Sequence, residues 1–257
     1  MRRSMVMLGC ALAAGLTVIR NASAIPEEDD ARALVQRVLD AAPKVPYVTR
    51  MTLTTPGGLV REFTMSGKTL ANGIDARYLE VTGPYNIKDT RYLLYDRSTR
   101  RDDQFVYVPF MKRIIRLSEK TRREPFLGST FYVNDIVVPP VDDFTYRFVG
   151  METIGQRSCR LIESVPKNPA QETYGRAVFA VDPIDLVVLR VQLYDHDDRL
   201  LKVHTIDKLE KVDGYWTPYL QTMRNVQDAD MSELETVDIQ YNAPIGDEVF
   251  REAHLGR

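Results

Sequence analysis

Three groups of residues have types and spacing that could support chemistry. Ser66-Gly67-Lys68-Thr69 is similar to the end of a phosphate-binding loop, but Glu62 stands where that loop needs its first glycine, and the segment has a strand pattern. The acidic run Asp195–Asp198 could chelate a cation, although four polar residues between two apolar strands are more typical of a hairpin turn. None of the three histidines accompanies a serine elbow of the G-x-S-x-G type. The sequence therefore predicts no enzyme, no bound metal and no cofactor.

The most informative stretch is instead apolar, and it covers residues 105–136. An aromatic strand ends at Pro109, and Arg113–Leu117 forms a second apolar strand. A basic link follows, and then large apolar side chains gather around Gly128, which permits a sharp bend. We call Phe126–Ile136 the lid segment, because this pattern indicates a greasy cover that opens and closes over a cavity. A hydrophobic plug that never moves is the alternative that the residues leave open.

The elements around this stretch follow from periodicity. Pro26 and the acids after it begin a helix whose apolar stripe continues to Ala42, and Pro43 ends it. After this helix the chain alternates with period two between turn signals. The predicted strands are Tyr47–Thr55, Leu59–Leu70, Ala76–Thr82, Thr90–Asp96, Gln104–Val108, Arg113–Leu117, Phe144–Glu152, Arg157–Val165, Ala177–Val181, Val187–Tyr194, Leu200–Glu210, Tyr215–Asn225 and Leu234–Tyr241. Short connections make neighbours antiparallel, and so many strands in one sheet must curl around the one available helix.

The stretch from residue 105 also carries a family resemblance. Its order Y-x-P, K-R-x-x-R and F-x-G-S-x-F-x-x-x-D-I resembles the outer-membrane lipoprotein-sorting proteins, the LolA-like periplasmic carriers. Later segments fit the same pattern, and together they cover nearly all of the mature chain: Val181-Asp182-Pro183, Val187–Tyr194, Asp213–Pro218, Val237–Asn242 and Asp247–Phe250. The resemblance implies a mainly β (α+β) fold. In that fold an incomplete antiparallel β-barrel, or half-barrel, wraps around an N-terminal helix, is closed by short helical lid segments and holds acyl chains in an apolar cavity.

Strand alternation and the lid pattern give the candidate site residues, although the concave face of each strand cannot be assigned from the sequence. The residues expected to line the apolar cavity and its lid are Phe63, Met65, Tyr78, Tyr92, Leu94, Phe105, Tyr107, Phe110, Met111, Ile114, Phe126, Phe131, Tyr132 and Ile136. The basic residues expected to contact lipid head groups or a membrane partner are Lys112, Arg113, Arg116, Arg122 and Arg123. A solvated loop and strand face is the alternative for the basic set.

The N-terminus is typical of a secretory signal peptide. Arg2 and Arg3 precede an apolar run that ends at Ala22-Ser23-Ala24, and the run is too short to span a bilayer. We expect cleavage after Ala24, export to the periplasm, and a single domain over residues 25–257. The leader contains three of the 34 Lys and Arg residues. The mature chain therefore has 31 basic and 36 acidic residues and a net charge of −5. Such a chain is not built to bind nucleic acid.

The function that the sequence predicts is a carrier, expected to be a monomer. It would bind lipid or lipoprotein acyl chains and shuttle them between membranes. The resemblance also implies an inner-membrane transporter of the resistance-nodulation-division (RND) type as partner. Two alternatives stay open: a binder of a free hydrophobic molecule, such as a hopanoid, sterol or polyene lipid, and a structural periplasmic protein that transports nothing.

Overall fold

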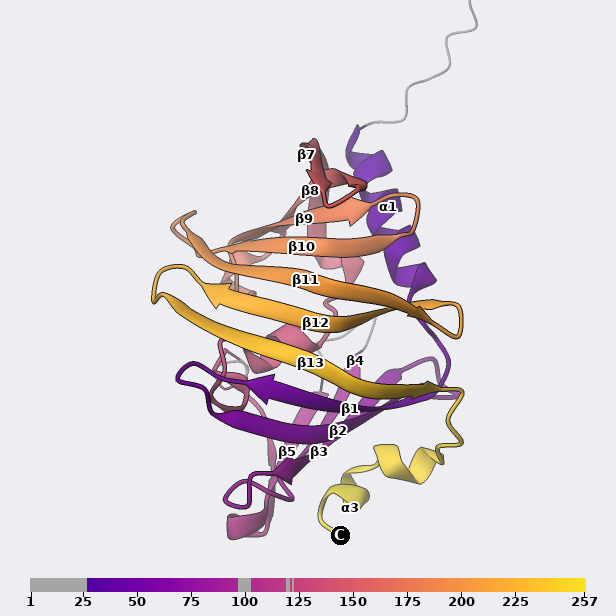
Figure 1. Ribbon diagram of the computed structural model, residues 1–257, viewed down its shortest axis with the longest axis vertical. Helices are drawn as coiled ribbons and strands as arrows, with labels where there is room; N and C mark the ends of the chain where they lie inside the picture. Colours follow the sequence, from indigo (N-terminus) through magenta and orange to yellow (C-terminus); the bar gives the residue numbers. More distant parts are fainter. Residues whose placement is uncertain (1–26, 97–102, 119–120, 122) are drawn as a thin grey trace, which may run out of the picture.

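The structure is a computed structural model that describes residues 27–96, 103–118, 121 and 123–257 (Figure 1). The leader and its cleavage site lie outside the described residues, and so does Arg122. In the described part, thirteen strands form one antiparallel sheet. They are β1 (Tyr47–Thr54), β2 (Val60–Thr69), β3 (Asp75–Gly83), β4 (Arg91–Asp96), β5 (Asp103–Val108), β6 (Arg113–Arg116), β7 (Phe144–Ile154), β8 (Arg157–Pro166), β9 (Arg176–Asp182), β10 (Val187–Tyr194), β11 (Leu200–Val212), β12 (Tyr215–Asn225) and β13 (Asp230–Tyr241).

The strands follow two runs of consecutive neighbours that meet in the middle of the sheet. The spatial order is β6-β5-β4-β3-β2-β1-β13-β12-β11-β10-β9-β8-β7, so the pairing of β1 with β13 joins the two runs. β6 and β7 are the two edges of this sheet although they are consecutive along the chain. The residues between them must therefore travel from one edge to the other. The lid segment lies within this connection and packs on the concave side of the sheet.

The helix and strand predictions agree with the structure to within a few residues. α1 covers Glu27–Ala41 and ends before Pro43, as expected. The largest difference is β13, which begins at Asp230 and not at Leu234. Its first residues pair with the end of β12, with Asp230 opposite Asn225. The polar residues Asp230, Ser232 and Glu233 have low strand propensity, which is why the pattern missed them.

The helix occupies only part of the concave face. Ala31 and Leu34 of α1 are buried in one cluster with Tyr146, Ile162 and Val181, which belong to β7, β8 and β9. The remainder of this face is covered by the lid segment, whose Phe126, Phe131 and Val133 share a second cluster with residues of β1, β2, β3, β5, β10 and β12. The predicted incomplete barrel with an N-terminal helix is confirmed. Its interior is filled by α1 and by the lid segment.

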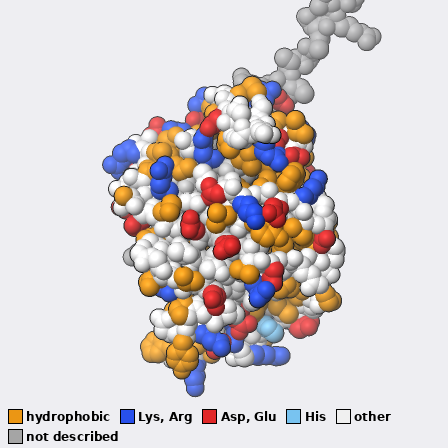
Figure 2. Space-filling model, in the orientation of Figure 1, with side chains coloured by type: hydrophobic (Ala, Val, Ile, Leu, Met, Phe, Trp, Pro, Cys, Tyr) orange, Lys and Arg blue, Asp and Glu red, His pale blue; other side chains and the backbone are white. Residues whose placement is uncertain are grey.

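The C-terminal segment covers part of the opposite, outer face. It contains the 3₁₀ helix η6 (Asp247–Phe250) and the short helix α3 (Glu252–Leu255), which lie beside the lower strands in Figure 1. Phe250 and Leu255 are buried against Tyr78, Leu93 and Phe105. On the face shown in Figure 2, acidic and basic side chains are interspersed, so that no field of one sign dominates this view.

The two polar motifs of the sequence have structural roles. Ser66–Thr69 lies inside β2, where a Cβ on Gly67 would come within 2.3 Å of the Tyr47 ring. Lys68 donates hydrogen bonds to Asp247 (2.6 Å) and to the carbonyl of Ile245 (3.0 Å), and so ties the C-terminal segment to the sheet. Asp195–Asp198 forms the turn of the β10–β11 hairpin, as expected, with the Asp195 carboxylate accepting the backbone N–H of Arg199 at 2.9 Å.

Candidate functional site

The lid segment folds as two short 3₁₀ turns, η2 (Phe126–Gly128) and η3 (Val133–Ile136). Gly128 has φ of +79°, so it supplies the bend that its sequence context predicts. The Phe126 ring makes edge-to-face contacts with Phe63 at 6.0 Å and Tyr92 at 5.3 Å between ring centroids. Packing of this kind contributes on the order of 1.5–3 kcal/mol for each large side chain that is buried.

Several predicted cavity residues lie on the concave face as expected. Phe63 is buried in the cluster under the lid, and Met65, Tyr92 and Ile136 pack against that cluster. Leu94 is fully buried and shares the face of Tyr92, two residues before it on β4. The structure therefore brings β2 and β4 together with the lid segment.

Tyr78, Phe105 and Tyr107 were expected to line the same cavity, and this placement is wrong. They lie on the outer face of β3 and β5, in the cluster covered by the C-terminal segment. Neighbouring residues of a strand point to opposite faces of the sheet. Assigning the wrong alternate set to the concave face therefore misplaces every side chain of that set. Both faces of these strands carry large apolar residues, so their sequence does not show which row is inside.

The tip of the β5–β6 hairpin also differs from the expectation. Phe110, Met111 and Ile114 are 92%, 45% and 41% exposed, so they do not line an interior cavity. A 3₁₀ turn, η1 (Pro109–Met111), reverses the chain here, and Lys112 adopts the left-handed conformation with φ of +49°. A tight turn at the sheet edge carries these side chains into solvent.

The described basic residues of the expected contact set do not form one patch at the lid. Lys112 and Arg113 are exposed at the β5–β6 hairpin, and Arg116 lies at the end of edge strand β6. Arg123 precedes the lid and donates to the carbonyl of Ala170 at 3.4 Å. Their role in contacting head groups or a partner remains a prediction.

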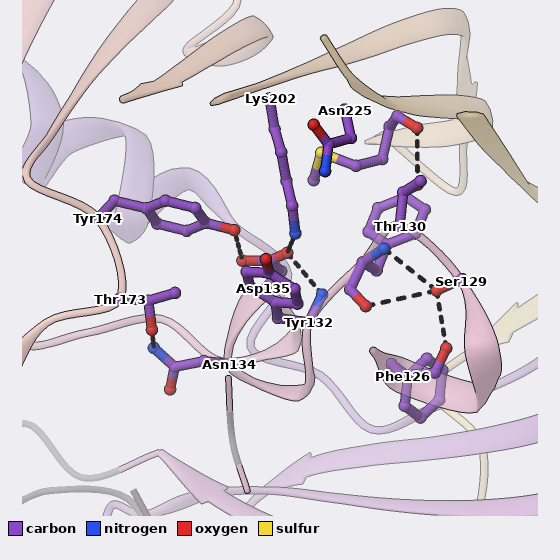
Figure 3. A network of polar contacts seen from close by, with 12 residues as sticks. Phe126, Ser129, Thr130, Tyr132, Asn134, Asp135, Thr173, Tyr174, Lys202 and Asn225 are labelled. Atoms are coloured by element: carbon purple, nitrogen blue, oxygen red, sulfur yellow. Dashed lines mark hydrogen bonds and ion pairs between the residues drawn. The ribbon is translucent and has the colours of Figure 1, made fainter. Parts of the chain in front are cut away.

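Polar contacts that the sequence did not reveal hold the lid segment to the sheet (Figure 3). The backbone N–H of Thr130 donates to the Ser232 hydroxyl at 3.0 Å, and the Thr130 hydroxyl donates to the carbonyl of Met223 at 2.7 Å. Further along, the Asn134 amide donates to the Thr173 hydroxyl at 3.1 Å. The lid is thus fixed by directed hydrogen bonds in addition to apolar burial.

The centre of this network is Asp135, at the end of η3. Its Oδ1 accepts the Tyr174 hydroxyl at 2.8 Å, and its Oδ2 accepts the backbone N–H of Tyr132 at 2.8 Å. Lys202 of β11 reaches the same carboxylate, with Nζ 3.6 Å from Oδ2 (Figure 3). The ammonium also lies 3.0 Å from the centroid of the Tyr132 ring, a close cation–π contact.

Lys202 is fully buried, at 0% exposure. Burial lowers its pKa to about 8, and the charge of Asp135 opposes that shift only in part. Two residues further along β11, burial also lowers the pKa of His204, whose Nε2 lies 3.2 Å from the Gln221 side-chain oxygen. At neutral pH the interior therefore holds a charged lysine beside a neutral histidine.

A cavity of about 230 Å³ lies between the lid and the β7–β12 half of the sheet. Its walls include Phe131 and Val137 on the lid side and Phe179, Leu193 and Met223 on the sheet side. The polar side chains of Asp135, Tyr174 and His204 also line it. This volume is below the roughly 300–1,000 Å³ of ordinary ligand pockets, so a full lipid chain requires the lid to shift outward.

A second hollow of about 370 Å³ lies beside the end of α1 and the loop of residues 138–142. Charged side chains line much of it, including Arg32, Asp40, Lys44 and the half-buried Arg77–Asp96 ion pair. Although it is larger, this lining suits water more than an acyl chain. Of these two spaces, the cavity under the lid has the lining that suits an acyl chain, and we assign the candidate site to it.

Within the described ranges, no cluster of three or more His, Cys, Asp or Glu is placed to hold a metal ion. No helix of the described chain is both long and apolar enough to cross a bilayer.

Lys202, Asp135 and Tyr174 are the site residues that sequence reasoning missed. The only signal was a lysine inside the apolar strand Leu200–Val203, with the same parity as His204. Sequence reasoning places such a lysine on the solvent face, because buried lysines are rare. Its acidic partner, Asp135, is 67 positions away, in a segment that carries no strand pattern. No local pattern therefore indicates that the two residues form an ion pair.

Comparison with known proteins defines the class. A family model with the description "-like: Uncharacterized protein" matches residues 73–257, more than half of the chain, and the chain belongs to that family. A DUF1329 family protein from Desulfovibrio piger superimposes with a TM-score of 0.83 at 24% identity, over 89% of this chain and 99% of that one. A putative outer membrane lipoprotein-sorting protein domain from Vibrio parahaemolyticus gives 0.83 at 21% identity, covering 90% of this chain and 100% of the other.

A LolA superfamily protein from Nitrosomonas europaea gives a TM-score of 0.67 at 16% identity, over 87% of this chain and 98% of its own. No curated protein matches the sequence. The protein thus has the fold of the LolA-like lipoprotein-sorting proteins, and the resemblance inferred from residues 105–136 is confirmed.

Proposed function

We propose that this protein is a periplasmic carrier that binds lipid or lipoprotein acyl chains under its lid and moves them between membranes. The observation that carries the proposal is the apolar cavity between Phe131 of the lid and the β7–β12 half of the sheet. The fold shared with lipoprotein-sorting proteins supports it. In this proposal residues 1–24 are a cleaved leader, residues 25–257 act as one monomeric domain, and an RND-type transporter is the membrane partner.

The construction of the lid suits reversible loading. Phe126, Phe131 and Val133 bury apolar area that an acyl chain could replace, while a limited number of hydrogen bonds tie the lid to β12 and β13. Each such bond is worth about 1 kcal/mol net. Because both contributions can be exchanged for contacts with cargo, the closed empty form and the open loaded form lie close in free energy.

Uptake of a fluorescent fatty acid tests the cavity assignment. Phe131→Asp places a charge in the cavity wall and should lower uptake at least tenfold, since a buried large side chain is worth about 1.5–3 kcal/mol. Ile114→Asp is the matched control, because Ile114 is exposed on β6. It should leave uptake unchanged. If wild type and Phe131→Asp are both folded and take up the fatty acid equally, the binding site does not lie in the cavity under the lid.

A free hydrophobic cargo, such as a hopanoid, sterol or polyene lipid, remains the second candidate. The small volume of about 230 Å³ favours a compact guest over several acyl chains at once. Competition of each lipid class against the fluorescent fatty acid separates the two cargo types. A structural protein that transports nothing would take up none of them.

A further inference from the structure

Lys202 places a positive charge at the edge of the apolar cavity. Its cross-strand neighbour on β10 is Leu193, and His204 follows it on the same face of β11. Both of these residues line the cavity. A cation in this position is therefore adjacent to the space that an acyl chain would occupy.

The Lys202 ammonium has no hydrogen-bond acceptor among the described residues. The carboxylate of Asp135 is 3.6 Å from Nζ, which makes an ion pair but exceeds a hydrogen-bond length. An ammonium has three donors, and buried donors in native proteins are normally paired. Its surroundings are otherwise the faces of Tyr132 and Tyr174, at 3.0 and 5.8 Å from the ring centroids. The site is therefore short of an anionic acceptor.

Asp135 does not depend on Lys202 for its own hydrogen bonds. One oxygen accepts the Tyr174 hydroxyl and the other accepts the backbone N–H of Tyr132. An outward shift of the lid would carry Asp135 away from Lys202, which would then lose the one carboxylate that pairs with it among the described residues. A group that arrives with its own negative charge would compensate that loss and stabilise the open lid.

We propose that Lys202 binds the carboxylate of a fatty acid whose chain enters the cavity under the lid. This inference rests on the proposed carrier function and narrows its cargo. One buried cation balances one negative charge, whereas the dianion of a phosphate monoester beside Asp135 would leave uncompensated negative charge in the interior. The acyl chains of a lipoprotein are linked as esters or amides, so they carry no such charge and would gain nothing from Lys202.

The test compares laurate with methyl laurate, which has the same chain and no charge, by calorimetric titration of the secreted protein at pH 7. The wild type should bind laurate about 10- to 100-fold more tightly, since a hydrogen-bonded charge contributes about 1.5–3 kcal/mol. Lys202→Met should remove that preference and leave the affinity for methyl laurate unchanged. Lys208→Met is the matched control on the same strand, because Lys208 is exposed, and it should keep the preference.

Lys202→Met leaves Asp135 without a cationic neighbour, so the double variant Lys202→Met/Asp135→Asn supplies a neutral interior if the single variant is unstable. It should show the same loss of preference. Equal wild-type affinity for the two ligands, or a preference that survives in both variants, overturns the inference and leaves the carrier function standing. Binding of neither ligand by the wild type overturns both.

Discussion

A buried lysine opposite a carboxylate of the lid segment is the main residue-level feature of this protein. Lys202 is held by Asp135 and two tyrosine rings, and these contacts only partly offset its loss of hydration. Such a group costs stability while it is charged. We interpret that cost as the source of binding specificity for an anion.

This cost should appear in the pH dependence of unfolding. Burial lowers the pKa of Lys202 from 10.5 to about 8, so the folded protein holds the proton more weakly than the unfolded chain. Stability therefore rises as pH increases through the window from 8 to 10.5. Relative to Lys202→Met, the wild-type free energy of unfolding should increase by about 2 kcal/mol between pH 7 and 9.5.

Urea unfolding of both proteins at several pH values measures this difference. The other titratable groups that face Lys202 are Asp135, Tyr132, Tyr174 and His204, and all of them are present in both proteins, so their contributions largely cancel. Burial raises the pKa of both tyrosines, which keeps them neutral over this range. A difference that stays constant from pH 7 to 9.5 would show that Lys202 titrates normally.

At the scale of elements, the lid segment is the part that must move in the proposed carrier. It crosses between the two sheet edges as short 3₁₀ turns, and its contacts with the sheet combine apolar burial with single hydrogen bonds. Local opening of such a segment requires much less free energy than global unfolding.

Weakening the hydrogen bonds from the lid to the sheet should promote this opening. Thr130→Val removes the bond to the Met223 carbonyl, and Ser232→Ala removes the acceptor of the Thr130 N–H. Each change should lower the free energy of opening the lid by about 1 kcal/mol and speed amide hydrogen exchange in residues 126–136 about fivefold. Thr222→Val is the control, since its hydroxyl bonds Asp207 on the exposed surface. Equal exchange in all variants would show that these bonds do not hold the lid.

The C-terminal segment should act on stability and not on binding. Phe250 is only 2% exposed and packs on the outer face of the sheet. Phe250→Ala should lower the free energy of unfolding by about 3–5 kcal/mol, measured in urea. Fatty-acid uptake by the fraction that remains folded should match the wild type. Reduced uptake at full folding would mean that the outer face contributes to the site.

The element boundaries were largely readable from the sequence because turn residues separate the strands. Asp195–Asp198 and the region around Asn72-Gly73 mark hairpins that the structure contains. The inward face was not readable for β3 and β5, since Tyr78 and Phe105 are as apolar as the residues that do face the lid. Lys202 and Asp135 were hidden because an ion pair between distant segments leaves no local pattern.

At the scale of the whole molecule, the order of the strands explains the site. Because β6 and β7 lie at opposite edges, the chain between them must connect one edge to the other, and its lid residues pack on the concave side of the sheet. α1 fills one part of that side and the lid fills another. The cavity of about 230 Å³ remains between the lid and the sheet.

The affinity of a cavity of this kind should depend on the length of the acyl chain that it binds. Affinity for saturated fatty acids should increase by ~0.8 kcal/mol for each methylene group that becomes buried. A calorimetric series from eight to fourteen carbons measures this slope, and the heat-capacity change of binding should be negative. Affinity that is independent of length would indicate that only the head group is bound.

Native mass spectrometry of the protein purified from its native host is the sharpest test of cargo binding under the lid. We expect a recurring extra mass of one lipid on the wild type, and an ion that fragments as a free fatty acid if Lys202 selects a carboxylate. The same preparation of Phe131→Asp should lack this mass, while Ile114→Asp should retain it. A wild-type protein that is always free of lipid, in repeated gentle preparations, would contradict a carrier with its cargo under the lid.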